Sequence, residues 1–155
     1  MGVAGSGKST LAASLAAKLQ RPWLEGDAFH SEPSRRKMAE GEPLTDDDRA
    51  SWLASLCEQL RGQPGAILAC SALKRSYREQ LRAASPGLRF AFLDIDRAEA
   101  GRRVRTRGGH FFAASLIDSQ FDTLEPPTGE PGVLRLDALR PLAALQSSVA
   151  EWLTP

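Results

Sequence analysis

Residues 2–9 read Gly-Val-Ala-Gly-Ser-Gly-Lys-Ser and match the pattern G-x-x-x-x-G-K-[S/T]. Glycines let such a loop curl until successive backbone N–H groups point at one anion, and the positive end of a following helix strengthens the site. Leucine and alanine spacing from Lys8 to Lys18 predicts that helix. The alternative is a glycine-rich turn that matches by chance. We expect a nucleotide-binding loop, with Lys8 on the outer phosphates, Ser9 on Mg²⁺, and these binding residues: Gly2, Val3, Ala4, Gly5, Ser6, Gly7, Lys8, Ser9 and Thr10.

Apolar runs alternate with helical patterns along the rest of the chain. This alternation predicts an α/β fold with a parallel sheet and helices on both faces. Ligands of such sheets bind at the carboxyl ends of the strands, where Asp27, Ser71–Lys74 and the loop after Asp137 fall. The expected strands are 22–27, 65–70, 88–96 and 132–138, and the expected helices are 8–18, 45–62, 72–84, 97–107, 111–124 and one from Pro141 onward.

The bulk composition narrows the function classes. A chain of 155 residues with 42% hydrophobic residues is long enough for one domain with its own core. A net charge of +1 argues against a nucleic-acid partner, and no apolar run is long enough to span a bilayer. The two cysteines form neither a disulfide framework nor a metal cluster, so we expect reduced thiols and a cytoplasmic protein without a membrane partner.

Five further stretches, in this order behind the loop, resemble gluconate kinases, which are small P-loop kinases related in fold to shikimate kinase. The resemblance implies ATP-dependent phosphorylation of D-gluconate at the 6-hydroxyl, with Mg²⁺, a helical lid and a homodimer. It implies a single P-loop kinase domain over 1–155, with a substrate-binding segment at about 28–55 and a lid at about 106–127. The stretches are GDAFH (26–30), KMAEGEPLTDDDR (37–49), CSALKRSYRE (70–79), RGGHFF (107–112) and SQFDTLEPP (119–127).

Asp27 closes the first expected strand, where its carboxylate can hold Mg²⁺ or accept a proton from an attacking hydroxyl. A helix-capping aspartate is the alternative, and the resemblance favours the catalytic role. Lys74 and Arg78 lie four residues apart on one helical face. A solvated basic face would explain them equally well, but the resemblance implies that they bind the substrate carboxylate. Further expected substrate contacts are His30, Arg49 and Gln120.

Four arginines crowd into residues 102–107, where like charges repel one another unless an anion is bound. Lid arginines can neutralise charge on the phosphoryl group in flight, and the resemblance favours Arg103 and Arg107 for this catalytic role. A solvated helix is again the alternative. By analogy with the fold, we expect the loop around Ala138–Arg140 beside adenine.

Only Met1 precedes the loop, whereas in the family an apolar strand leads into it. We therefore expect the first strand of the family fold to be missing from this chain. Each backbone group that its loss leaves buried and unpaired costs about 1–3 kcal/mol. Either the working protein carries several more residues upstream, which we favour, or this form is unstable. Two other functions stay open: a small P-loop kinase for another acceptor, and a truncated nucleotide-binding protein without turnover.

Overall fold

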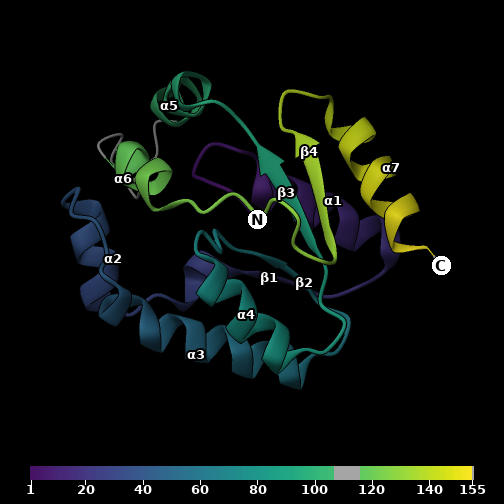
Figure 1. Cartoon of the computed structure of the whole chain (residues 1–155), viewed down its shortest axis with the longest axis horizontal. Helices are drawn as coiled ribbons and strands as arrows, with labels where there is room; N and C mark the ends of the chain where they lie inside the picture. The colour runs from purple at the N-terminus through teal and green to yellow at the C-terminus, as the bar shows by residue number, and fades with distance from the viewer. Residues whose placement is uncertain (107–115, 155) are drawn as a thin grey trace.

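The computed structural model describes residues 1–106 and 116–154 (Figure 1). A short 3-10 helix, η1 (Gly26–Phe29), follows the first strand. The strands are β1 (Trp23–Glu25), β2 (Ile67–Ala69), β3 (Phe90–Asp94) and β4 (Val133–Asp137). The helices are α1 (Lys8–Leu19), α2 (Glu32–Ala39), α3 (Asp46–Gly62), α4 (Arg75–Ala84), α5 (Arg97–Thr106), α6 (Leu116–Thr123) and α7 (Leu142–Leu153).

Local signals explain where several helices begin. Thr45 and Asp48 form a reciprocal capping box at the start of α3, which satisfies two backbone donors that the helix itself leaves unpaired. Helix α2 was absent from the sequence prediction, although Ser31 caps it through the backbone N–H of Ser34. Helix α4 begins at Arg75 rather than Ala72, because Ala72 adopts a left-handed conformation (φ 45°) that no helix can include.

The strands form two parallel pairs rather than one continuous sheet. Strand β1 pairs with β2, with Trp23 opposite Ile67, and β3 pairs with β4, with Phe90 opposite Val133. The two pairs are separate in Figure 1, and a cavity of about 380 Å³ lies between β2 and β3.

Met1 connects the two pairs. Its amino group donates to the carbonyl of Ala91 at 2.6 Å, and its carbonyl accepts from the N–H of Leu93 at 3.0 Å. On the other side, the N–H of Gly2 donates to the carbonyl of Ser71, just beyond β2, at 3.2 Å. These bonds hold the start of the phosphate loop between β2 and β3.

Side chains of β3 alternate between two apolar layers, as expected for a strand covered on both faces. Phe90 and Phe92 pack with Trp52 and Leu56 of α3, in a layer that α4 completes. Leu93 faces the opposite layer, which α1 and α7 supply. The predicted α/β arrangement of parallel strands with helices on both faces is therefore confirmed.

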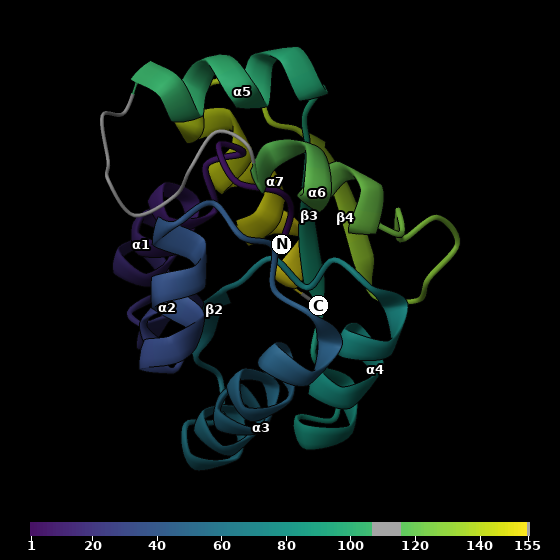
Figure 2. The same ribbon diagram turned by 90° about the vertical axis from the view of Figure 1, so that its left-hand side faces the viewer.

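Helices α5 and α6 lie side by side at the end of the molecule where β3 finishes (Figure 2). The predicted helix 111–124 is represented by α6, and residues 107–115 lie outside the described residues. Within the described parts of the chain, no helix is long and apolar enough to cross a membrane.

Candidate active site

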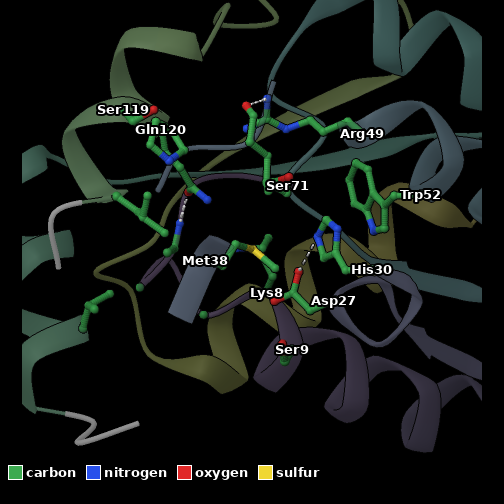
Figure 3. A pocket seen from close by; sticks show the side chains of 17 residues that line it. Lys8, Ser9, Asp27, His30, Met38, Arg49, Trp52, Ser71, Ser119 and Gln120 are labelled. Atoms are coloured by element: carbon green, nitrogen blue, oxygen red, sulfur yellow. Dashed lines mark hydrogen bonds and ion pairs between the residues drawn. The ribbon is translucent and has the colours of Figure 1, made fainter. Parts of the chain in front are cut away.

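A cleft of about 200 Å³ opens at the carboxyl ends of β1 and β2 (Figure 3). Segments from most of the chain meet there: the phosphate loop, η1, α3, the connection that follows β2, and α5 with α6. Its lining consists of Ala4, Gly5, Gly7, Lys8, Ser9, Asp27, His30, Met38, Pro43, Leu44, Arg49, Trp52, Ser71, Val104, Leu116, Ser119 and Gln120.

The phosphate loop has the backbone shape that its glycines predict. Gly5 and Gly7 have φ values of 80° and 96°, which side-chain-bearing residues rarely adopt. A Cβ atom at Gly5 would also lie 2.7 Å from the carbonyl oxygen of Ala100 in α5. Within the described structure no side chain caps the start of α1, so its first N–H groups stay available to an anion in the cleft.

Two polar side chains of the loop, those of Lys8 and Ser6, differ in whether they have a hydrogen-bond partner. Lys8 Nζ donates to the carbonyl of Val3 at 2.9 Å, which folds the lysine back over the loop. Ser6 Oγ is buried and has no hydrogen-bond partner among the described residues. A buried hydroxyl without a partner is costly, so an incoming polar group would be stabilised there.

Asp27 sits on η1 immediately after β1, and its side chain is 57% exposed. His30, three residues later, is buried and stacks on Trp52 of α3 with ring centroids 4.8 Å apart. Burial lowers the pKa of His30, although the Asp27 carboxylate 4.0 Å away opposes this effect. His30 is therefore a neutral ring near pH 7, and its buried Nδ1 has no partner in the described structure.

Trp52 also positions the aspartate. Its indole Nε1 donates to the carbonyl of Gly26 at 2.8 Å, in a buried hydrogen bond that joins α3 to the residue before Asp27. Gly26 in turn packs against Ala69 and Cys70 at the end of β2. This contact anchors the carboxylate to the sheet.

Helix α6 completes the cleft opposite Asp27. Its Gln120 side chain accepts the N–H of Ala4, in the phosphate loop, at 2.7 Å. Leu116 of α6 packs with Met38 of α2 and with Leu44 in a small apolar cluster. Arg49 Nη1 donates to the carbonyl of Leu44 at 2.6 Å, which holds this guanidinium at the cleft wall.

The structure gathers most of the predicted site residues in this cleft. Lys8, Ser9, Asp27, His30, Arg49 and Gln120 line it together with Ala4, Gly5 and Gly7. Gly2, Val3, Ser6 and Thr10 belong to the same loop or its helix but do not line the cleft. Arg107 lies outside the described residues.

Lys74 and Arg103 stand near the cleft without lining it. Lys74 Nζ pairs with the Asp46 carboxylate at 2.8 Å, and this contact raises the pKa of Lys74 and lowers that of Asp46. Arg103 donates to Glu99 at 2.8 Å and to the carbonyl of Ala138 at 3.3 Å. It therefore reaches the loop predicted to neighbour adenine.

The structure does not bring Arg78, which was predicted to bind substrate, into the cleft. The side chain is fully buried on the inner side of α4, and it binds Glu130 and three backbone carbonyls instead of facing the cleft. Spacing of four residues placed Lys74 and Arg78 on one face, but Lys74 precedes the first turn of α4, so the two side chains diverge.

Eight lining residues were not predicted as site residues: Met38, Pro43, Leu44, Trp52, Ser71, Val104, Leu116 and Ser119. Trp52 falls in the predicted helix 45–62, and in the structure it packs in the core as well as lining the cleft. The sequence places Ser71 at the ligand-binding edge of the sheet without indicating a role for it. Met38 and Ser119 reach the cleft through helix packing that the local sequence does not encode.

The cleft combines an anion-binding loop with a lysine, a carboxylate and an arginine, which suits transfer of a phosphoryl group to a hydroxyl. Oxygen ligands for a hard divalent cation are also present, because the Ser9 hydroxyl and the Asp27 carboxylate both line it. Mg²⁺ commonly takes only one or two protein ligands and completes its shell with water and phosphate oxygens. The described residues contain no cluster of three or more His, Cys, Asp or Glu side chains suited to a metal, which is consistent with such a sparse site.

Known proteins resemble this chain over most of its length. A family model described as an AAA domain matches residues 1–127. The chain is 48% identical to a gluconokinase from Gluconobacter oxydans (strain 621H), over 88% of this chain and 79% of that protein. It is 41% identical to the thermoresistant gluconokinase from Escherichia coli (strain K12), over 97% of this chain and 89% of that protein. The crystal structure of a gluconokinase from Sinorhizobium meliloti 1021 superposes with a TM-score of 0.87 at 44% identity, covering 99% of this chain and 92% of that one.

Proposed function

This chain belongs to the gluconokinase family, and from that membership we propose how its own residues phosphorylate gluconate. The protein is a P-loop kinase that transfers a phosphoryl group from ATP to gluconate. We assign the 6-hydroxyl as the acceptor and 6-phosphogluconate and ADP as the products. The single observation that carries the assignment of residues is the convergence of the phosphate loop, Asp27 and Arg49 in one cleft.

Residues 2–10 bind the triphosphate. Backbone N–H groups of the loop and of the first turn of α1 surround the phosphates, since no side chain in the described structure caps that turn. Lys8 exchanges its contact with the Val3 carbonyl for the outer phosphates, where it neutralises charge in the transition state. Arg103, already tied to the carbonyl of Ala138, places α5 beside the expected adenine loop.

The acceptor lies between Asp27 and α6. The Asp27 carboxylate takes the proton of the attacking hydroxyl, whose oxygen forms the new bond to phosphorus as the bond to the ADP oxygen breaks. Transfer is direct and in line, and no covalent enzyme intermediate forms. Residues 28–55 form most of the acceptor wall.

Each polar wall residue has a distinct role toward the polyol acid. Arg49 has the fork of donors that grips a carboxylate, and its position at the cleft wall is fixed by Leu44. His30 offers a neutral ring nitrogen that has no partner among the described residues, which suits a hydroxyl. Gln120 has its carbonyl oxygen occupied by Ala4, so its amide nitrogen is left to donate. Lys74 adds a second cation once it leaves Asp46.

Ser9 and Asp27 are the residues that would hold Mg²⁺. Such an ion supplies charge neutralisation for the phosphates during transfer. We assign segment 106–127 as the lid. Arg107 within it and Arg103, which precedes it in α5, neutralise the phosphoryl group in flight.

A coupled ADP-release assay over a panel of sugar acids and nucleotides tests this function. Release with gluconate and ATP, but not with shikimate or nucleoside monophosphates, is the expected result. Release on another acceptor alone would replace gluconate in the proposal. Nucleotide binding without release on any acceptor would identify a binding protein without turnover.

We also propose a homodimer, which rests on the resemblance to the family, and a cytoplasmic location, which rests on the two cysteines. Light scattering at micromolar concentration measures the mass directly. A value near twice the 16.8 kDa of one chain is expected, and a value near 16.8 kDa at all concentrations would contradict the dimer.

A further inference from the structure

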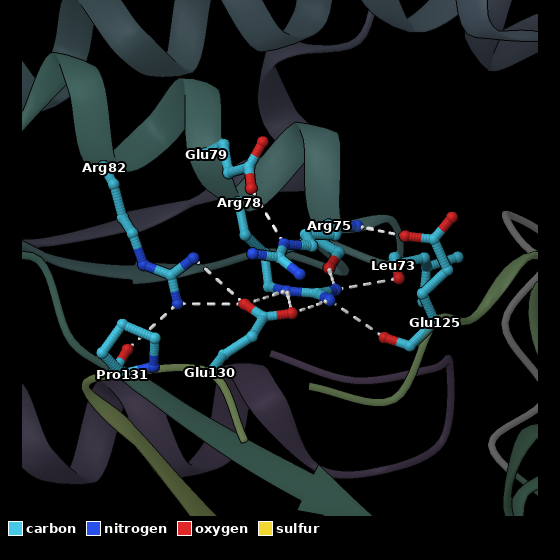
Figure 4. Close-up of polar contacts among 9 residues, drawn as sticks. Leu73, Arg75, Arg78, Glu79, Arg82, Glu125, Glu130 and Pro131 are labelled. Atoms are coloured by element: carbon cyan, nitrogen blue, oxygen red, sulfur yellow. Dashed lines mark hydrogen bonds and ion pairs between the residues drawn. The ribbon is translucent and has the colours of Figure 1, made fainter. Parts of the chain in front are cut away.

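A fully buried guanidinium joins the connection after β2 to the connection after α6 (Figure 4). It belongs to Arg78, in the first turn of α4, and the Glu130 carboxylate accepts from its Nε at 3.0 Å and also from its Nη2. Arg82, one turn later, donates to the same carboxylate at 3.0 Å. These two arginines lower the pKa of Glu130, so its carboxylate stays charged below neutral pH.

The remaining donors of Arg78 reach backbone carbonyls in two separate segments. Nη1 donates to Ala72 at 2.8 Å and to Leu73 at 2.9 Å, in the connection between β2 and α4. Nη2 donates to Glu125 at 3.0 Å, in the connection that follows α6. One side chain thus joins segments more than forty residues apart in the sequence.

Both segments lead directly to residues that line the cleft. Ser71 precedes Ala72, whose left-handed conformation (φ 45°) is strained for a residue with a side chain and needs support from its surroundings. Leu124 continues the backbone bonding of α6 by donating to Gln120, and Gln120 is the residue that contacts the phosphate loop. A displacement of either segment would therefore move a group that faces substrate.

Two further bonds connect the same segments. The N–H of Glu125 donates to the carbonyl of Leu73 at 2.9 Å. The Glu125 carboxylate accepts from the N–H of Arg75 at 2.6 Å, which caps α4 in place of a local side chain. Arg78 is the member of this set that contacts both segments and also carries the buried charge.

We propose that Arg78 is a positioning residue for the acceptor side of the active site. It fixes the position of the segment that follows Ser71 relative to the end of α6. Ser71 and Gln120 are thereby held where they can contact the sugar acid. A lysine could not do this, because its ammonium has three donors on a point charge, whereas the planar guanidinium has five donors in a rigid fork. The proposal rests on the proposed function for its kinetic consequence.

The test compares Arg78→Lys with Arg82→Lys. Both changes are on α4 and both alter a partner of Glu130, but Arg82 contacts no carbonyl of the two segments, since its backbone acceptor is Pro131. Arg78→Lys is expected to raise KM for gluconate by about tenfold or more, the loss expected when one hydrogen bond to the acceptor is weakened, while KM for ATP changes less than about twofold. Arg82→Lys should leave both KM values within about twofold of the parent.

Glu130→Gln is the second variant in case Arg78→Lys fails to fold. It keeps the volume and an acceptor oxygen but removes the charge that holds the guanidinium, and we expect the same selective rise in KM for gluconate. The proposal would be overturned if both KM values changed equally, or if the melting temperature fell with neither KM changed. Either result would show that Arg78 contributes only to stability.

Hydrogen exchange measured by mass spectrometry tests the positioning role of Arg78 independently of the proposed kinase activity. Peptides covering 70–75 and 119–126 should exchange faster in Arg78→Lys than in Arg82→Lys, whatever the acceptor proves to be. If the parent protein turns over no acceptor, the proposed function fails while this readout still decides the role of Arg78. Unchanged exchange in both peptides would refute the positioning role.

Discussion

Gly26→Ala tests the link between the sheet and the catalytic aspartate. Gly26 is buried, and a Cβ atom there would lie 2.5 Å from the carbonyl oxygen of Ala69 and 2.9 Å from Cβ of Cys70. The nearest of these atoms is backbone at the end of β2, so it cannot rotate away. The new methyl group must therefore push η1, and Asp27 with it, away from the strand.

The expected magnitudes follow from that overlap. Overpacking of a buried site typically costs about 1–3 kcal/mol. For a chain of 155 residues each kcal/mol corresponds to about 2–4 °C in melting temperature, so we expect a decrease of about 2–12 °C. A shift of Asp27 by about 1 Å would lower kcat by about 100-fold.

Gly62→Ala is the matched control, because Gly62 ends α3 and an added Cβ there meets no atom within 4 Å. Alanine is the better helix former, so this variant should gain up to about 1 kcal/mol with kcat unchanged. Thermal unfolding and the coupled ADP-release assay measure both quantities. Parent-like stability and kcat in Gly26→Ala would show that the contact with β2 does not position Asp27.

Three other changes probe the cleft. Asp27→Asn removes the proton acceptor and should lower kcat by about 10²–10⁴ with ATP affinity retained in a fluorescent-nucleotide titration; normal turnover would exclude Asp27 as the base. Lys8→Met should raise KM for ATP and lower kcat by about 100-fold or more, and unchanged kinetics would contradict its phosphate contact. Burial lowers the pKa of His30 in the folded protein. Below about pH 6.5 the unfolded chain therefore binds a proton at His30 more readily than the folded protein does. The contribution of His30 to the free energy of unfolding declines as pH falls through that value. Urea unfolding should therefore show a smaller loss of stability between pH 8 and pH 5.5 in His30→Phe than in the parent, and an equal loss would refute a depressed pKa.

Local pattern was sufficient for much of the fold. Glycines at 5 and 7 predicted the phosphate loop because only a chain free of side chains there adopts its backbone shape. Thr45 and Gly62 predicted the limits of α3, since a cap and a helix end depend on neighbours in sequence. The place of Asp27 just after a strand predicted its position at the ligand-binding edge.

The tertiary structure decided the properties that depend on distant partners. The sequence shows Lys74 and Arg78 as equivalent cations, yet one pairs with exposed Asp46 and the other is buried against Glu130, fifty-two residues away. Trp52, Met38 and Ser119 enter the site only because α2, α3 and α6 pack around the same cleft. Burial and long-range hydrogen bonding, which decide whether a charged side chain binds substrate or supports the wall behind it, are not encoded in residue spacing.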